Sequence, residues 1–221
     1  MTEEEWLSGT NSRWMLKYAE QTPGLSPKIR GRKFHLAAVA LARELPGVDS
    51  ARWVILVAEA VERLCDGAAS HIEVQGLVGT ASYPPVSDGE PSWNSILWSL
   101  ASTTGYSAAY GVAASTLWET CSTAPGMSCD VTGFVPVQAK IIQDIFGNPF
   151  RRVAFDPSWR TSTAVGLAQT MYKSRGFDCM SILADALEEA GCDEPSVLSH
   201  CRGDGPHVRG CWVVDLVLGK E

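Results

Sequence analysis

The chain has 221 residues, of which 45% are hydrophobic and 19% are charged, so it has the composition of a globular protein with a sizeable core. Its formal net charge of −7 argues against general affinity for nucleic acid or anionic membranes, because surfaces that bind phosphate normally carry an excess of Lys and Arg. The acidic start has no apolar leader, and no uninterrupted apolar stretch approaches the length of a bilayer span, so we expect a soluble, cytoplasmic protein.

The N-terminus has the spacing of a helical capping box. Thr2 is followed three residues later by Glu5, so the hydroxyl can accept from the Glu5 amide while the carboxylate reaches back to the Thr2 amide. Apolar residues at helical spacing continue to Tyr18. We therefore predict a first helix that ends before Pro23 and is interrupted near residues 9–11.

A helix hairpin is predicted next. Pro27 suits the first position of a helix, and apolar residues at helical spacing give this helix one apolar face up to Leu45. The clearest helical periodicity of the sequence lies at 53–64, and Asp49 or Ser50 can cap that helix. Because only a handful of residues join the two helices, we expect them to pack as an antiparallel pair. The basic residues near the start of the first one are interpreted as a solvated face: Lys28, Arg30, Arg32 and Lys33.

The middle of the chain, residues 68–134, has no Lys or Arg and many Gly, Ser, Thr and Pro residues, so we expect it to be variable and rich in loops. Within it, helical spacing at 93–118 predicts one long helix, and 120–133 is predicted to be a loop. The stretch 131–137 is the one that most resembles a strand.

The last third is predicted to form short helices separated by loops that hold most of the Pro, Gly, His and Cys residues. The expected helices cover 138–146, 164–175, the residues between Asp178 and Gly191, 194–201, and a last helix that Pro206 opens. We expect Asp178 to cap the third of these and Trp212 to anchor the last one in the core. No segment alternates with period 2, so we predict an all-α fold, a compact multi-helix bundle with short loops, forming a single domain over 1–221.

Candidate metal ligands gather near the C-terminus. His207 and Cys211 are four residues apart, which places them on one face of the predicted last helix, and Cys201 or His200 can supply a further ligand. The residue types suit zinc, although the spacing lacks a Cys-x-x-Cys knuckle. The favoured interpretation is therefore buried thiols beside loop histidines, which require no cofactor, and zinc binding is the alternative. A Cys211 nucleophile with His207 as its base is a further alternative.

A small-ligand or anion site is a second candidate. Residues 200–211 lead a glycine-rich turn into a predicted helix N-terminus, where free amides attract anions, and they are expected to form a cleft with residues 147–160. The candidate ligand-binding residues are Arg151, Arg152, Trp159, Arg202, His207 and Arg209. The favoured alternative is that Asp204 caps the helix and the arginines bridge acids on neighbouring helices.

Several segments resemble an expanded family of uncharacterised planctomycete proteins. The similarity lies in MTEEEWL at 1–7, IFGNPF at 145–150, LADALEEAGC at 183–192 and HCRGDGPHVRGCWVVDL at 200–216. It covers roughly the first 65 and the last 85 residues, while the middle departs from the long Ala- and Trp-rich helix of that family. The resemblance implies a bacterial, mostly helical protein, and it carries over no activity and no functional residue.

No set of residues converges on a known catalytic or cofactor motif. The chain has eight tryptophans, and those that exceed the needs of the core would mark a surface for a partner. The leading hypothesis is therefore a non-enzymatic interaction or scaffold protein of a bacterial cytoplasm that binds another protein. The alternatives are an enzyme or small-ligand protein with its site between the 147–160 and 200–211 loops, and a zinc-binding protein.

Overall fold

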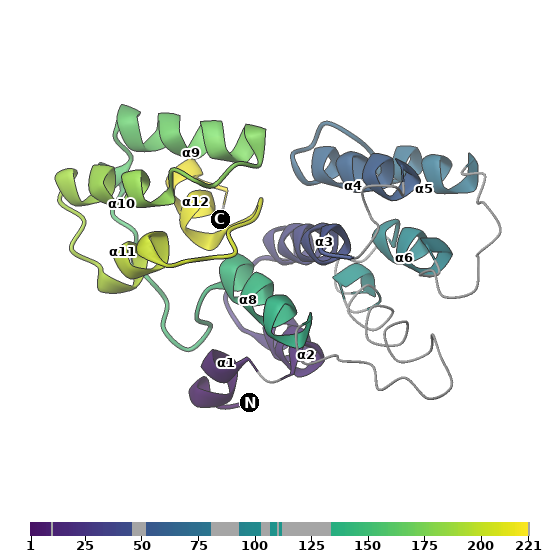
Figure 1. Ribbon diagram of the computed structural model, residues 1–221, viewed down its shortest axis with the longest axis horizontal. Coiled ribbons are helices and arrows are strands. Elements are labelled where there is room, and N and C mark those ends of the chain that lie inside the picture. Colours follow the sequence, from purple (N-terminus) through teal and green to yellow (C-terminus); the bar gives the residue numbers. More distant parts are fainter. Residues whose placement is uncertain are drawn as a thin grey trace. The chain divides into compact units, whose positions relative to one another are not determined.

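The computed structural model describes residues 1–9, 11–45, 52–80, 93–102, 107–109, 111 and 134–220. All regular secondary structure in these ranges is helical, which confirms the predicted all-α fold (Figure 1). No helix in them is both long and apolar enough to cross a membrane. The chain divides into two compact units, Met1–Ile142 and Gln143–Glu221, called the first and second unit below. The single domain expected over 1–221 stays a prediction.

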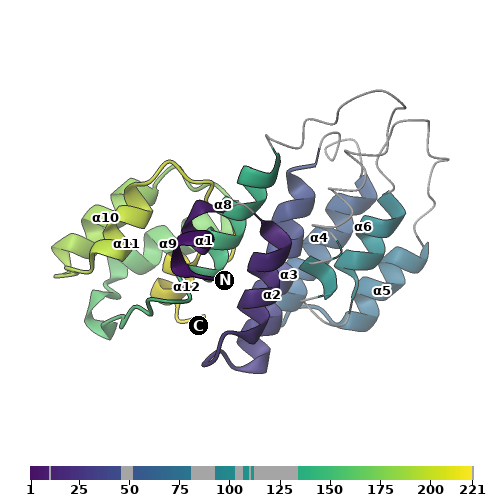
Figure 2. The same ribbon diagram turned by 90° about the horizontal axis from the view of Figure 1, so that it is seen from below.

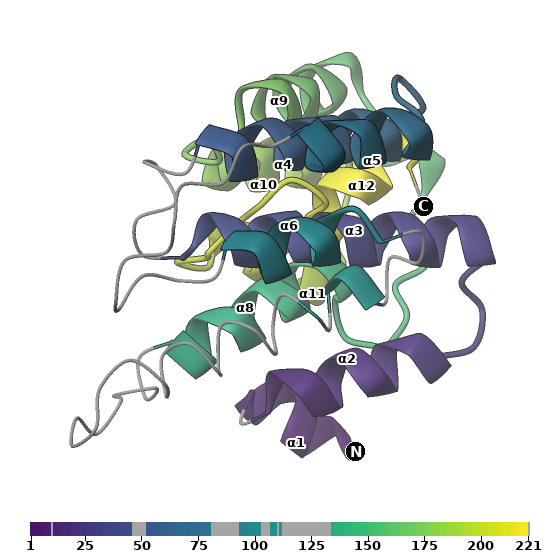
Figure 3. The same cartoon turned by 90° about the vertical axis from the view of Figure 1, so that its right-hand side faces the viewer.

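The first unit is built around one buried helix, α3 (Pro27–Arg43). The other helices with residues in this unit are α1 (Glu3–Ser8), α2 (Ser12–Gln21), α4 (Arg52–Cys65), α5 (His71–Thr80), α6 (Trp93–Leu100) and α8 (Phe134–Phe146), which continues past Ile142. In two views α3 lies between α2 and α4 (Figures 2 and 3), and it packs against α4 and α6. Residues 33–42 are all buried, so α3 has no solvated face there and Lys33, only 2% exposed, departs from the predicted basic surface.

The N-terminal helices begin and end where their local sequence directs. Thr2 Oγ1 accepts from the Glu5 amide (3.2 Å), and Glu5 Oε2 accepts from the Thr2 amide (2.7 Å), so the predicted capping box forms. Gly9 ends α1 at φ +60°, a left-handed conformation that glycine adopts without a Cβ clash. Asn11 then caps α2 by accepting from the Trp14 amide (3.1 Å), which confirms the predicted interruption.

The predicted antiparallel hairpin is formed by α3 and α4, which pack against each other. Cys65 at the end of α4 lies beside Arg32 in the first half of α3, with its Sγ 3.8 Å from the Arg32 carbonyl oxygen. Arg43 at the other end of α3 pairs with the buried Glu62 of α4 (3.4 Å). The caps predicted at Asp49 and Ser50 lie outside the described residues.

The middle of the chain differs from its prediction in three places. Helix α5 occupies 71–80, where loops were expected, because Val74 and Val78 are one turn apart and buried while α5 packs on α4. The single helix predicted for 93–118 is interrupted, because α6 ends at Leu100 and a turn follows, whereas the described residues 107–109 and 111 are helical again. Helix α8 begins at Phe134, so the strand-like interpretation of 131–137 is wrong from that residue on. The loop predicted for 120–133 lies outside the described part of the chain.

The second unit contains the end of α8 and a group of short helices around a core of its own. These are η2 (Pro157–Trp159), α9 (Ser162–Ser174), α10 (Met180–Glu189), α11 (Pro195–Arg202) and α12 (Trp212–Leu218). Helix α9 packs against α10 and α12, and α11 packs against the same two helices. Leu183, Val197 and Val213 are fully buried between them.

Three predictions for helix ends in the second unit are wrong. Asp178 does not cap α10, whose N-cap is Cys179 without a side-chain bond. Helix α9 ends at Ser174, one residue before the predicted end, because Arg175 takes the left-handed position, at φ +57°. The last helix begins at Trp212, not at Pro206, because Gly205 and Gly210 adopt positive φ and the intervening backbone is not helical.

Candidate metal centre

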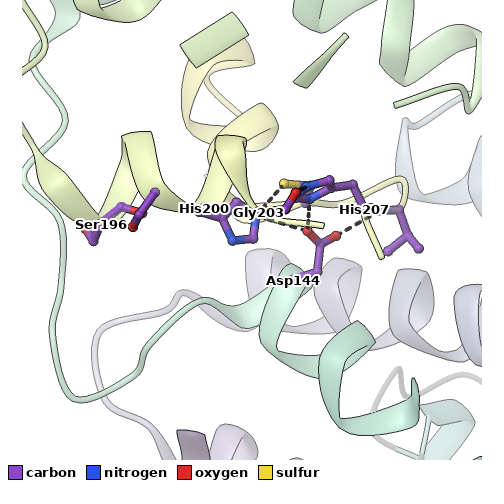
Figure 4. Close-up of polar contacts among 8 residues, drawn as sticks. Asp144, Ser196, His200, Gly203 and His207 are labelled. Carbon is purple, nitrogen blue, oxygen red and sulfur yellow. Dashed lines mark hydrogen bonds and ion pairs between the residues drawn. The ribbon is translucent and has the colours of Figure 1, made fainter. Parts of the chain in front are cut away.

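Four potential metal ligands meet inside the second unit (Figure 4). They are Asp144 near the end of α8, His200 in the last turn of α11, His207 in the segment between α11 and α12, and Cys211 at the N-cap of α12. One ligand atom from each side chain lies within 4.8 Å of all the others. We call this group the metal centre.

The ligand atoms of the metal centre face a shared point and do not form a linear series of hydrogen bonds. Asp144 Oδ1 lies 2.9 Å from His207 Nδ1 and 3.0 Å from His200 Nε2. The same His200 Nε2 lies 3.2 Å from Cys211 Sγ. One carboxylate oxygen therefore faces two imidazole nitrogens, and one of these nitrogens also faces the sulfur.

Neighbouring groups hold the ligands in place. The Val208 amide donates to Asp144 Oδ2 (2.9 Å), which orients the carboxylate and leaves Oδ1 for the two histidines. The Nε2 atom of His207, on the far side of the ring from Asp144, lies 3.4 Å from the Gly203 carbonyl oxygen. Metal-binding histidines commonly donate their second ring nitrogen to a backbone carbonyl in this way, and metal-binding carboxylates are commonly hydrogen-bonded as well.

Burial and the close contacts within the metal centre shift the pKa values of three of its members. The Asp144 side chain is 2% exposed, and burial pushes its pKa upward, but hydrogen bonds from His200 and His207 outweigh this and hold the pKa below its usual value. Burial also lowers the pKa of His207, and its hydrogen bond and attraction to Asp144 reverse this to a raised value. Burial, followed by the charge of Asp144, raises the pKa of the Cys211 thiol well above its usual value.

The nucleophile interpretation of Cys211 does not fit this geometry. In a Cys–His–Asp relay the acid bonds one ring nitrogen and the thiol the other, so that the histidine can pass a proton between them. The predicted base, His207, directs Nδ1 to Asp144 and Nε2 towards the Gly203 carbonyl oxygen. The imidazole in contact with Cys211 is that of His200, and Asp144 and Cys211 face the same atom of it, Nε2. Cys211 is also fully buried with a raised pKa, whereas a catalytic thiol needs access to substrate and a depressed pKa.

Of the three ligands predicted from the sequence, the structure brings together His207 and Cys211 and places Cys201 elsewhere. Cys201 is 1% exposed within the apolar core of the second unit, where burial raises its pKa to about 12. Its neighbour His200 points into the metal centre instead, because successive residues of a helix project about 100° apart. His207 and Cys211 were predicted to share one face of a helix. They come close together, but the backbone between them is irregular.

The candidate ligand-binding arginines at the C-terminal end are engaged by other groups. Arg202 pairs with Asp185 (3.0 Å) and Glu188 (2.6 Å) of α10, as the alternative interpretation of that residue proposed. The guanidinium of Arg209 lies over the ring of Tyr172, 4.3 Å from its centroid.

The remaining residues of the predicted ligand site lie around the segment before α9. Trp159 belongs to η2 and is packed in the core of the second unit, with its ring against Phe155. The side chains of Arg151 and Arg152 are exposed. Of the candidate ligand-binding residues, His207 alone is a member of the metal centre.

Asp144 was not identified from the sequence. Along α8, Ile141, Ile142 and Ile145 form an apolar stripe, and helical periodicity places Asp144 outside it, where solvent is expected. The residue is nevertheless buried, and its partners are more than 55 positions away in the chain.

Comparisons of the chain with protein-family models, with curated proteins and with solved structures give no match.

Proposed function

We propose that the protein binds a divalent transition-metal ion, zinc, in the second unit through Asp144, His200, His207 and Cys211. The observation that carries this proposal is the convergence of Asp144 Oδ1 and Cys211 Sγ on the same nitrogen, His200 Nε2. A proton relay spreads its partners over two ring nitrogens, whereas ligands of one metal ion all face a common point.

The distances support a tetrahedral ion of the size of zinc. Zinc–ligand bonds of about 2.0–2.3 Å place tetrahedral ligand atoms about 3.3–3.6 Å apart. The three short contacts of the metal centre, at 2.9, 3.0 and 3.2 Å, need to open by only a few tenths of an ångström to reach this range, and all four ligand atoms lie within 4.8 Å of one another. The Val208 amide, which donates to Asp144 Oδ2, and the Gly203 carbonyl oxygen beside His207 Nε2 already set the orientation of these two ligands.

The ligand chemistry favours zinc over other ions. One thiolate, two imidazoles and one carboxylate form a mixed set that is too soft for Mg²⁺ or Ca²⁺, which prefer oxygen ligands. Blue-copper centres pair two histidines and a cysteine with a weak, distant axial ligand. Here Asp144 Oδ1 is as close to the imidazole nitrogens as the sulfur is to His200, which suits four similar bonds.

Metal content of the purified protein tests the proposal. We expect one zinc per chain by elemental mass spectrometry, and loss of it in His207→Ala and Cys211→Ser, because each change removes a ligand. Cys179→Ser is the matched thiol control and Cys201→Ala the control for the ligand predicted from sequence, since neither residue belongs to the metal centre. Wild-type protein that neither retains zinc nor takes it up from a competing chelator would leave a hydrogen-bond network as the explanation of the cluster.

We propose as a second candidate the interaction role expected from the tryptophan content. Trp14 on α2 and Trp98 on α6 are 60% and 61% exposed, which is unusual for so large an apolar side chain. A protein partner bound through these residues should be lost in a Trp14→Ser/Trp98→Ser double variant and kept in Ile182→Ser, which removes an apolar residue that is 53% exposed on α10. Equal recovery of the same partner with all three proteins would contradict this role.

A further inference from the structure

The metal centre offers four protein ligands in a nearly closed environment. The side chains of Asp144 and His207 are 2% and 8% exposed, Cys211 is fully buried, and His200 is the most open at 20%. Catalytic zinc sites combine three protein ligands with a water or substrate in an open fourth position, whereas structural sites fill all four positions with protein atoms. The ligand count and the burial both match the second class.

The ligands also come from segments of the second unit that are far apart in the chain or joined by an irregular segment. Residues 203–211 join α11 to α12 without forming a helix, and this segment supplies His207 and Cys211. Asp144 meets it at a third point, because its Oδ2 accepts from the Val208 amide. An ion at the metal centre would therefore tie this segment to α8 and to α11.

The position of Cys211 extends the effect of the ion into the core. Cys211 is the N-cap of α12, although its side chain makes no capping bond, and the α12 residues Val213 and Val217 are buried in the core. A bond from the ion to the cysteine would fix where α12 begins and hence which of its residues face α9. The choice of which α12 side chains pack against α9 would then depend on the ion.

We infer that the ion is structural: it is held by four protein ligands with no open position, and it fixes residues 203–211 and the start of α12. This inference rests on the proposed zinc binding. It assigns the ion to the folding of the second unit, because a site assembled from distant segments does not exist in the unfolded chain and its binding energy contributes to folding. It also excludes a metal-bound water as the reactive group.

Cobalt substitution tests whether the coordination is closed. We expect zinc-free protein to take up one Co²⁺ and to show the intense visible bands of a tetrahedral ion together with a thiolate-to-cobalt charge-transfer band. Azide, added as an external ligand, should leave these bands unchanged in the wild type and alter them in Asp144→Ala, where one position is opened. His200→Ala is a second opened variant in case Asp144→Ala does not fold.

Hydrogen exchange tests the structural role in the same wild-type chain. We expect amides of 203–218 to exchange roughly tenfold faster or more after zinc is removed by a chelator, since local opening lowers protection, while amides of α3 in the first unit keep theirs. Absence of any cobalt or zinc binding would overturn the proposed function itself. Bound cobalt whose bands respond to azide, or bound zinc that leaves exchange at 203–218 unchanged, would overturn the structural role and leave metal binding intact.

Discussion

At the scale of single residues, His35 is the buried titratable group of the first unit whose surroundings are best defined. It is 6% exposed on α3, with Nδ1 2.9 Å from the Gly31 carbonyl oxygen and Nε2 3.1 Å from that of Ser102. A neutral imidazole has one N–H and can donate to only one of these carbonyls. Burial nevertheless lowers the pKa of His35, the two carbonyls oppose this without outweighing it, and a charge on His71 lowers it further.

A lowered pKa predicts that acid weakens the fold around His35. Between the unfolded value of about 6.5 and the lower folded value, the unfolded chain binds a proton that the folded chain does not. The contribution of His35 to stability is therefore complete above pH 6.5 and is lost as the pH falls through this window. We expect an NMR titration to give the ring a pKa below 6.5.

Replacing the histidine checks the link to stability. His35→Gln should show a shallower loss of unfolding free energy between pH 7 and pH 5 than the wild type, with the zinc concentration held constant. His71→Gln removes only the smallest of the causes that shift the pKa of His35 and leaves His35 in place, so it should keep most of the wild-type pH dependence. An identical pH dependence for His35→Gln and the wild type would show that the proton uptake occurs elsewhere.

At the scale of elements, the end of α8 beside the metal centre depends on a glycine. Gly147 has φ +66°, and a Cβ at this position would lie 3.2 Å from Cγ of Trp212, the first residue of α12. A side chain there costs roughly 1–2 kcal/mol for the left-handed backbone, and the tight contact adds to it. We expect Gly147→Ala to lower the free energy of unfolding by at least this amount, measured by urea denaturation.

A second glycine of the same unit provides the matched control. Gly166 lies in the middle of α9, where a Cβ would meet no described atom within 4 Å. Gly166→Ala should raise the free energy of unfolding by about 0.5–1 kcal/mol, because alanine loses less backbone entropy in a helix. If both alanines acted in the same direction, backbone conformation would not be the cause of either effect.

The elements that could be predicted from the sequence are those fixed by local chemistry. The Thr2 capping box, the start of α3 at Pro27 and the end of α8 at Phe146 are each set within a few residues, and each appears as expected. Helix α5 was missed because Gly76 and Gly79 weaken its intrinsic propensity and packing on α4 compensates.

The last helix was predicted to begin at Pro206, six residues before its observed start at Trp212, because a proline at this place is compatible with a helix start and with an irregular turn. Pro206 can begin a helix, but Gly205 and Gly210 on either side of it adopt positive φ, and the Val208 amide donates to Asp144 of α8. Trp212, predicted to be buried, is half-buried against the ring of His200, 5.2 Å away between centroids. Both outcomes depend on a residue or ring from another element, which local spacing does not reveal.

At the scale of the whole molecule, the candidate metal centre shows where prediction from sequence stops. His207 and Cys211 were identified by residue type and nearness in the chain, and His200 was weighed as an alternative to Cys201. Asp144 joins them only through the tertiary packing that brings α8 to the segment after α11. The chemistry of the site was therefore readable from the C-terminal residues, whereas its fourth ligand required the fold.

The division into two units leads to a prediction about thermal unfolding. All four ligands lie in Gln143–Glu221, so zinc bound to the folded metal centre stabilises that unit directly. Free zinc at about a thousand times its dissociation constant contributes about 4 kcal/mol, and each kcal/mol shifts the midpoint of a domain of 60–100 residues by roughly 4–8 °C. Scanning calorimetry should therefore show two transitions, with zinc moving one of them upward by more than about 10 °C.

The assignment of that transition can be checked with variants that each affect one unit. Gly166→Ala should shift the zinc-dependent transition and His35→Gln the other, because the two residues lie in different units. If a single transition moved as a whole with zinc and with both variants, the two units would unfold together. In that case the single domain expected from the sequence would be the correct description, and zinc would stabilise the first unit through its cooperativity with the second.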